Sequence, residues 1–135
     1  MSRPVAVGLG CDRGTPLPTL AQALAEALQQ AGARPADVAG AASITLKADE
    51  PGLLALAAQQ GWRIHFYAPA ELAEVPVPNP SEVVRRHTGT PSVSEAAALL
   101  AAGGAGARLL VEKHKLRGAD GRHATVSIAA LAPRP

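Results

Sequence analysis

An apolar run that passes directly into closely spaced glycines constrains this chain more than any other feature. Residues 5–15 read Val-Ala-Val-Gly-Leu-Gly-Cys-Asp-Arg-Gly-Thr, and a proline follows at position 16. The apolar part is too short for a helix, whereas a Thr-Pro pair is typical of a helix start. The pattern therefore predicts a strand, a tight turn and then a helix.

The glycines of this segment, Gly8, Gly10 and Gly14, have two interpretations. Glycine lets a backbone approach a ligand closely, and free N–H groups at a helix start attract anions, which would suit a negatively charged ligand. The same glycines would equally serve a tight connection from strand to helix. The order G-x-G-x-x-x-G matches neither the dinucleotide fingerprint nor a Walker loop, because the spacing differs and no Gly-Lys-Ser/Thr follows.

Length and apolar content predict a single domain over residues 1–135. Of the 135 residues 47% are hydrophobic, which is enough to bury a core without disulfides or a structural metal. The apolar residues are mainly alanine, leucine and valine, so helices are expected to pack closely on a sheet.

Charge and targeting signals exclude several classes of function. The net charge is only +2, and few aromatic residues are available to stack on bases, so we expect no nucleic-acid partner. No secretory signal precedes Val5, and no apolar run approaches the roughly 20 residues that span a bilayer, so we expect no membrane partner. The single cysteine, Cys11, is consistent with a reducing cytosol. These features predict a soluble, cytoplasmic protein.

Strand and helix patterns alternate along the rest of the chain. Helices are predicted at 17–31, from 50 to Gly61, at 69–72, at 81–87 and from 92 to 103, and further strands at 41–46, 63–67, 108–113 and 124–129. This order predicts an α/β fold, a three-layer sandwich with a mostly parallel mixed sheet, helices on both faces and one C-terminal antiparallel strand. Three prolines at 76, 78 and 80 predict an extended connector.

Several acidic and hydroxyl residues have the spacing of helix caps. Asp49 is placed to cap the second helix, with Glu50 in its first turn. The pairs Asn79/Glu82 and Ser92/Glu95 have the capping-box spacing. For Glu50 and for the residues of these two pairs we consider capping a simpler interpretation than catalysis.

The last two strands are predicted to be joined by a basic loop over residues 113–123, whose Gly118 and Gly121 allow an antiparallel return. His114 and His123 are not evidently opposite each other in a simple register. No cysteine or second acid is spaced for zinc, so neither a metal site nor a bound cofactor is expected.

Polar residues follow several strands, and parallel strands end at one edge of a sheet. Residues 11–13, 47–50, 67 and 113–115 would all lie at that edge. The balance there is cationic, from Arg13, Lys47, Lys113, Lys115 and Arg117 against Asp49 and Glu50. A ligand with several carboxylates or phosphates would match this charge, although solvated charges at strand ends are also common. Lys47 favours an anionic partner, because a lysine at a helix start is otherwise unfavourable.

Four segments together resemble the CobE family, the module that also forms the C-terminal domain of CbiG, the cobalt-precorrin-5A hydrolase of anaerobic cobalamin biosynthesis. They read G-L-G-C-D-R-G-T, A-S-I-T-L-K-A-D-E-P-G-L, V-P-N-P-S-E-V-V with T-G-T-P-S-V-S-E-A-A-A, and L-L-V-E-K with T-V-S-I-A. The resemblance covers nearly the whole chain in the right order. It implies action on precorrins, tetrapyrroles that carry many acetate and propionate carboxylates. The chain starts only a few residues before its first strand, so the other domain of the hydrolase is not expected in it.

Three functions follow from the resemblance and the charge pattern. The first is an accessory or carrier protein that binds a precorrin and passes it between cobalamin-pathway enzymes. Its expected partners are the precorrin and those enzymes. The second is a hydrolase or lyase that opens a precorrin δ-lactone and releases a two-carbon fragment, with Asp49 or Glu50 as general base and Lys47 stabilising the oxyanion. The third is a docking subunit without a small ligand. The predicted binding residues are Gly8, Gly10, Cys11, Arg13, Gly14, Thr15, Lys47, Asp49, Glu50 and Lys113.

Overall fold

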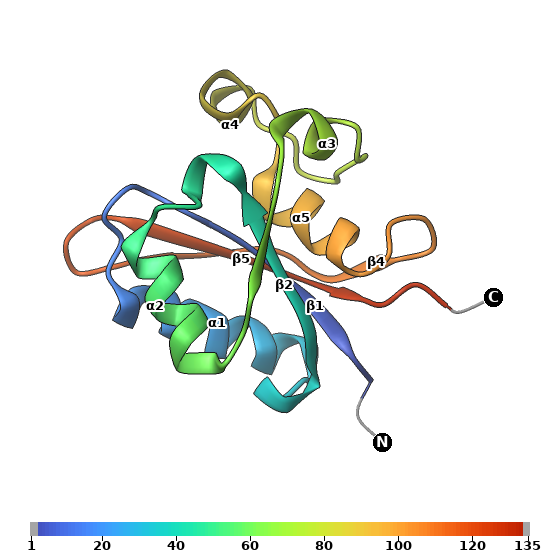
Figure 1. Ribbon diagram of the computed structural model, residues 1–135, viewed down its shortest axis with the longest axis horizontal. Helices are drawn as coiled ribbons and strands as arrows, with labels where there is room; N and C mark the ends of the chain where they lie inside the picture. The colour runs from blue at the N-terminus through green and yellow to red at the C-terminus, as the bar shows by residue number, and fades with distance from the viewer. Residues whose placement is uncertain (1–2, 134–135) are drawn as a thin grey trace.

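The computed structural model describes residues 3–133, which form an α/β fold around one five-stranded mixed sheet (Figure 1). The strands are β1 (Val5–Cys11), β2 (Val38–Ile44), β3 (Ile64–Tyr67), β4 (Arg108–Arg117) and β5 (His123–Ala130), and their order across the sheet is β3-β2-β1-β5-β4. The pairs β1/β2 and β2/β3 are parallel, whereas β5 is antiparallel to both β1 and β4. The sheet is therefore partly parallel.

Successive side chains of a strand point to opposite faces of the sheet. Because apolar side chains of β1 point to both faces, helices cover both of them. The helices are α1 (Leu17–Ala31), α2 (Pro51–Gln60), α3 (Pro69–Ala73), α4 (Glu82–Thr88) and α5 (Val93–Ala101), with short 3₁₀ turns η1 (Pro35–Asp37) and η2 (Thr45–Lys47). Val5, Val7 and Leu9 of β1 pack in one core with α1 and α2. Ala6 packs on the opposite side with Ala98 of α5. Figure 1 shows α1 and α2 on one side and α3, α4 and α5 on the other.

Local signals place the helix ends correctly in several cases. Gly32 and Gly61, both with positive φ, end α1 and α2. Ser81 accepts a hydrogen bond from the Val84 N–H and begins α4, which Gly89 ends. These positions agree with the predicted helix boundaries.

Two predicted caps are wrong, and a third has the predicted position without the hydrogen bonds of a capping box. The N-cap of α2 is Glu50 rather than Asp49, and the N-cap of α4 is Ser81 rather than Asn79. Ser92 does occupy the N-cap of α5, but its hydroxyl makes no cap hydrogen bond and is buried without a partner within residues 3–133. Glu95 is buried and accepts hydrogen bonds from the backbone N–H and the side-chain amide of Asn79 instead. Tertiary contacts therefore override the capping-box spacing.

The predicted basic loop is also wrong, because β4 continues to Arg117 and the turn is confined to residues 118–122. Residues on β4 alternate: His114 bonds to Glu26 of α1 and Leu116 packs in the α1 core, whereas Lys113 and Lys115 lie on the other face. β5 is inserted between β1 and β4 rather than added at the sheet edge. Because β5 is antiparallel to both, β1 and β4 run in the same direction.

One edge of the sheet therefore collects the carboxyl ends of β1, β2, β3 and β4 together with the start of β5. Within the described part of the chain, no helix combines the length and the apolar character needed to cross a membrane.

Candidate functional site

A cavity of about 630 Å³ lies at this edge, on the face of the sheet that α5 covers. Its volume falls within the range of small-molecule sites, about 300–1,000 Å³. Its walls come from the ends of β1 and β2, from β4 and β5, from α4 and from the start of α5. The lining residues are Gly10, Cys11, Asp12, Arg13, Ile44, Leu46, Lys47, Val83, Val84, His87, Thr88, Val93, Ser94, Lys113, Lys115, His123 and Thr125.

Three lysines from two segments, η2 and β4, give the cavity a cationic lining. Lys47 comes from η2, and Lys113 and Lys115 lie two residues apart on β4. The Lys113 ammonium donates to the backbone carbonyl of Asn79 at 2.9 Å, and burial lowers the pKa of Lys113. Neither Lys47 nor Lys115 makes a hydrogen bond or salt bridge with another of residues 3–133, although Lys47 is near enough to Asp49 to lower the pKa of that carboxyl. Two ammonium groups are therefore available to an anionic ligand.

The cavity is also lined by apolar side chains. Val83 and Val84 come from α4, Ile44 from the end of β2, Leu46 from η2, and Val93 from α5. Val83 and Leu46 are largely exposed although they are apolar. Exposed apolar residues beside a row of cations suit a ligand that has both an apolar body and anionic substituents.

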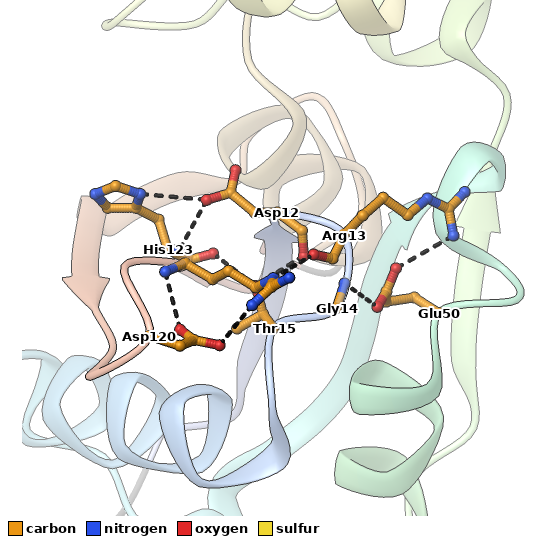
Figure 2. A network of polar contacts seen from close by, with 8 residues as sticks. Asp12, Arg13, Gly14, Thr15, Glu50, Asp120 and His123 are labelled. Atoms are coloured by element: carbon orange, nitrogen blue, oxygen red, sulfur yellow. Dashed lines mark hydrogen bonds and ion pairs between the residues drawn. The ribbon is translucent and has the colours of Figure 1, made fainter.

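Figure 2 shows how the β1–α1 loop is fastened to the β4–β5 hairpin. Asp12 Oδ2 accepts hydrogen bonds from the backbone N–H of His123 at 2.8 Å and from its ring nitrogen Nδ1 at 3.2 Å. The Asp12 N–H donates in return to the His123 carbonyl at 3.0 Å. Arg122 joins the same network, since its Nε donates to the Arg13 carbonyl and its Nη1 contacts Asp120. The network holds His123 in a fixed position beside the cavity.

The Arg13 side chain is occupied by acceptors from the β2–α2 segment. Its Nη1 lies 2.9 Å from Asp49 Oδ1 and 3.2 Å from Glu50 Oε2, and its Nη2 donates to the Leu46 carbonyl at 2.5 Å. The hydrogen bond from Arg13 holds the pKa of Asp49 below its usual range. Much of the positive charge predicted for the site at Arg13 is therefore neutralised within the protein.

Glu50 is buried, and its carboxylate binds the backbone of the β1–α1 loop. Its side chain is 1% exposed, and its Oε1 accepts the Gly14 N–H at 2.8 Å, as Figure 2 shows. The Thr15 N–H donates to the Asp12 carbonyl. Because protein acceptors already bind these two N–H groups, the predicted anion cradle in the turn at Gly14 and Thr15 is not available to a ligand.

Cys11 lies in the cavity wall, where burial raises the pKa of its thiol to about 11 despite the nearby Lys47. A thiol with this pKa is protonated at neutral pH, and thiols react as thiolates. Cys11 therefore contributes a contact surface rather than a nucleophile.

The structure brings half of the predicted binding residues together. Gly10, Cys11, Arg13, Lys47 and Lys113 line the main cavity. Gly14, Thr15 and Glu50 line a second, smaller pocket of about 290 Å³ on the other side of the loop. Asp49 lines neither pocket, and its side chain is 81% exposed. Gly8 is covered by α5, since a Cβ there would lie 1.9 Å from the Ser94 carbonyl oxygen.

Sequence reasoning did not assign several lining residues to the site. Thr88, Ser94, Thr125, His87 and His123 bring hydroxyl or imidazole groups to it. Ser94 is buried, and its hydroxyl lies 2.9 Å from that of Ser127. Thr125 and Ser127 alternate along β5, and this pattern could have predicted that their hydroxyl groups share one face of the sheet. No sequence pattern predicts that α4 lies over the cavity.

No group of three or more His, Cys, Asp or Glu side chains within the described residues is arranged to hold a metal ion. The imidazole ring of His123 is therefore not part of a free-metal site built by the protein alone.

Comparisons with known proteins agree with each other. A family model described as Cobalamin synthesis G C-terminus matches residues 5–129. Protein CobE from Sinorhizobium sp is 38% identical over 130 residues, which cover 95% of this chain and 80% of that protein. A crystal structure of CobE, described as a protein from the cobalamin (vitamin B12) biosynthetic pathway, matches with a TM-score of 0.80 at 37% identity, over 100% of this chain and 95% of that one.

A longer relative shares the same module. The cobalt-precorrin-5A hydrolase of Priestia megaterium is 36% identical over 99 residues, or 73% of this chain. The matched part is 26% of the hydrolase, so this chain corresponds to about a quarter of that relative's length.

Proposed function

Because the chain belongs to the CobE/CbiG C-terminal domain family of cobalamin biosynthesis, we propose that it binds a precorrin-type tetrapyrrole in the main cavity and acts as an accessory or carrier protein. The observation that carries this proposal is the pair of ammonium groups, Lys47 and Lys115, which make no hydrogen bond or salt bridge among residues 3–133 and line a cavity that also has apolar lining. A macrocycle with peripheral carboxylates has the matching combination of charge and apolar surface.

The positions of the lysines support a ligand with carboxylates on more than one side. Lys47 follows β2, which is next to β1, whereas Lys113 and Lys115 are on β4, beyond β5. The cations therefore approach the cavity from both sides of β1 and β5. A single small anion would contact one of these groups, whereas a large ring with several substituents can contact both.

The placement of Asp49 and Glu50, the two predicted general bases, favours binding over hydrolysis. Asp49 lines neither pocket and pairs with Arg13, and Glu50 accepts the Gly14 N–H and lines the second pocket instead of the main cavity. Neither carboxylate is positioned to activate water beside a ligand in that cavity, which general base catalysis requires. Hydrolysis of a precorrin lactone remains the alternative that a turnover assay tests.

The binding proposal is tested by titrating the protein with hydrogenobyrinic acid, a metal-free corrin ring with peripheral carboxylates, followed by its absorbance. We expect saturable binding that the double variant Lys47→Ala/Lys115→Ala weakens about tenfold, since two exposed ion pairs of about 0.7 kcal/mol each are lost. Lys113 is left intact in this variant because its ammonium also holds the Asn79 carbonyl.

The matched control is Arg63→Ala/Arg108→Ala, which removes the same charge at the opposite edge of the sheet, where β3 and β4 begin. We expect this control to bind like the wild type. Equal losses in both variants, or no loss in either, would contradict the cavity as the binding site.

A separate assay distinguishes binding from turnover. The protein is incubated with a lactone-bearing precorrin, and the mass of the tetrapyrrole is followed over time. A carrier returns the ligand at unchanged mass, whereas a hydrolase adds water and releases a two-carbon fragment. Turnover that depends on this chain would replace the carrier function with the hydrolytic one.

A further inference from the structure

The Asp12–His123 pair lies in the wall of the cavity and leaves one ring nitrogen of His123 without a partner among residues 3–133. Asp12 Oδ2 lies 3.2 Å from His123 Nδ1, and a carboxylate can only accept, so Nδ1 carries the proton. In the neutral ring the second nitrogen, Nε2, has a free lone pair, and no group within residues 3–133 bonds to it. Figure 2 shows Nε2 on the side of the ring away from Asp12. The His123 side chain is 49% exposed and lines the cavity.

Carboxylate support of this kind is the usual arrangement of a metal-bound histidine. The second ring nitrogen of such a histidine commonly donates to a carboxylate, which fixes the tautomer and increases the basicity of the ligating nitrogen. His123 has a second hydrogen bond to the same carboxylate, because Asp12 Oδ2 also accepts its backbone N–H at 2.8 Å. The imidazole ring and the backbone next to it are therefore positioned by one carboxylate.

A lone histidine cannot hold a free metal ion, but it can complete the coordination of one that a macrocycle already holds. Among the described residues no cluster of three ligating side chains exists. A metal inside a tetrapyrrole has four equatorial nitrogens from the ring and needs only axial ligands from a protein, as in haem proteins. One similar relative is named for a cobalt-containing substrate, the cobalt-precorrin-5A hydrolase.

The cavity has a second histidine that lacks this support. His87 on α4 also lines the cavity, but no carboxylate within the described residues contacts its ring. The contrast between the two histidines selects His123 and provides an internal control.

We propose that His123 Nε2 is an axial ligand for the metal of a cobalt corrinoid bound in the cavity, and that Asp12 is the residue that positions it. This inference rests on the proposed tetrapyrrole binding and specifies its ligand class. In the binding step the Nε2 lone pair replaces one axial water molecule on cobalt. The imidazole proton stays on Nδ1, so no proton is released and no electron is transferred.

The experiment compares two rings that differ in the metal. Cobyrinic acid carries cobalt, and hydrogenobyrinic acid is the same carboxylated ring without it. The cobalt ring is reduced to Co(II) under anaerobic conditions and mixed with the protein. An axial nitrogen then splits the electron paramagnetic resonance lines of low-spin Co(II) into triplets, because the ¹⁴N nucleus has spin 1. Protein labelled with ¹⁵N-histidine converts the triplets to doublets.

We expect the wild type to show the triplet splitting and to bind the cobalt ring about tenfold more tightly than the metal-free ring. His123→Ala should lose both the splitting and the preference for cobalt while still binding the metal-free ring. His87→Ala should retain the splitting and the ratio of the two affinities; because His87 also lines the cavity, any loss of affinity should be the same for both rings. Asp12→Ala should reduce the preference, and Asp12→Asn, which can still accept from Nδ1, should preserve the splitting.

Three results would overturn the assignment while leaving tetrapyrrole binding intact. They are a wild type that binds both rings equally without nitrogen splitting, splitting that persists in His123→Ala, and splitting that disappears in His87→Ala. If neither ring binds to the folded wild type, the proposed function itself fails, and the axial ligand fails with it. Thermal unfolding of each variant verifies that the fold is retained.

Discussion

Gly8 and Gly10 lie two residues apart on the same face of β1, yet their surroundings differ. A Cβ at Gly8 would lie 1.9 Å from the Ser94 carbonyl oxygen and 2.6 Å from the Ala98 backbone nitrogen, so α5 could not approach the sheet. A Cβ at Gly10 would meet only the Thr125 Cβ, at 3.9 Å, because the cavity begins there. The spacing of the glycines in the sequence does not distinguish these roles.

We therefore predict that Gly8→Ala lowers the free energy of unfolding by about 3 kcal/mol or more, since the backbone of α5 must move away from β1. Gly10→Ala is the matched control, and its effect should stay within about 1 kcal/mol. Urea unfolding followed by circular dichroism measures both. Similar unfolding midpoints for the two variants would show that α5 does not lie as close to Gly8 as described.

Cys11 allows a test of the same cavity wall by its ionisation. Because burial raises the pKa of the folded-state thiol from 9.0 to about 11, the folded chain holds the thiol proton more tightly than the unfolded chain. The stability gained in this way is present below pH 9 and is lost as the pH rises toward 11.

Alkylation of this single cysteine by iodoacetamide at pH 8 should be at least about 100-fold slower in the native protein than in urea, since the reactive thiolate is rarer by that factor. The native rate should rise with pH up to about 11, and the rate in urea should level off near 9. A native pH profile centred near 9 would mean that the thiol is open to solvent.

At the scale of elements, the sequence predicts what local contacts determine. Glycines with positive φ end α1 and α2 where expected, because the chain there must enter a left-handed conformation. The extent of β4 could not be predicted in the same way. Lys113, Lys115 and Arg117 are basic, and the two lysines lie on the face of β4 that borders the cavity. A segment this rich in charged residues is equally typical of a loop. Which interpretation holds depends on β5, which pairs with it.

The segment before α5 is the clearest case of tertiary contacts overriding local spacing. In a capping box Ser92 and Glu95 would bond to backbone N–H groups at the start of α5. Instead Glu95 is fully buried and binds Asn79, which in turn fastens the proline-rich connector to α5 and, through Lys113, to β4. The Ser92 hydroxyl has no partner among residues 3–133.

This arrangement predicts opposite outcomes for two variants. Asn79→Ala should lower the free energy of unfolding by about 2 kcal/mol, because it removes the side-chain hydrogen bond to a buried carboxylate. Ser92→Ala should leave the stability unchanged or raise it, because an unpaired buried hydroxyl is removed. Chemical denaturation measures both. A loss of about 1 kcal/mol in Ser92→Ala with no loss in Asn79→Ala would restore the capping box.

For the whole molecule, the topology predicts where the site lies but not which charges serve it. The carboxyl ends of parallel strands place Cys11, Lys47 and the lysines of β4 at one edge, as the sequence analysis expected. The ion pairs of Arg13 with Asp49 and Glu50 join residues more than 35 positions apart. No local pattern reveals such pairs, so the sequence assigned to Arg13 a role that Lys115 is better placed to fill.

If the free lysines provide the attraction for carboxylates, the binding of a corrin ring must depend on salt and on the number of its carboxylates. Raising NaCl from 0.05 to 0.5 M should weaken the binding of hydrogenobyrinic acid roughly fivefold, because screening removes about 1 kcal/mol from the two exposed ion pairs of Lys47 and Lys115. A fully amidated ring of the same size should bind more weakly and show little salt dependence. Isothermal titration of both rings tests this. The Arg63→Ala/Arg108→Ala protein should keep the wild-type salt response, since these arginines lie where β3 and β4 begin, at the far edge of the sheet. Equal affinity for the two rings at both salt concentrations would mean that the apolar lining rather than the lysine wall selects the ligand.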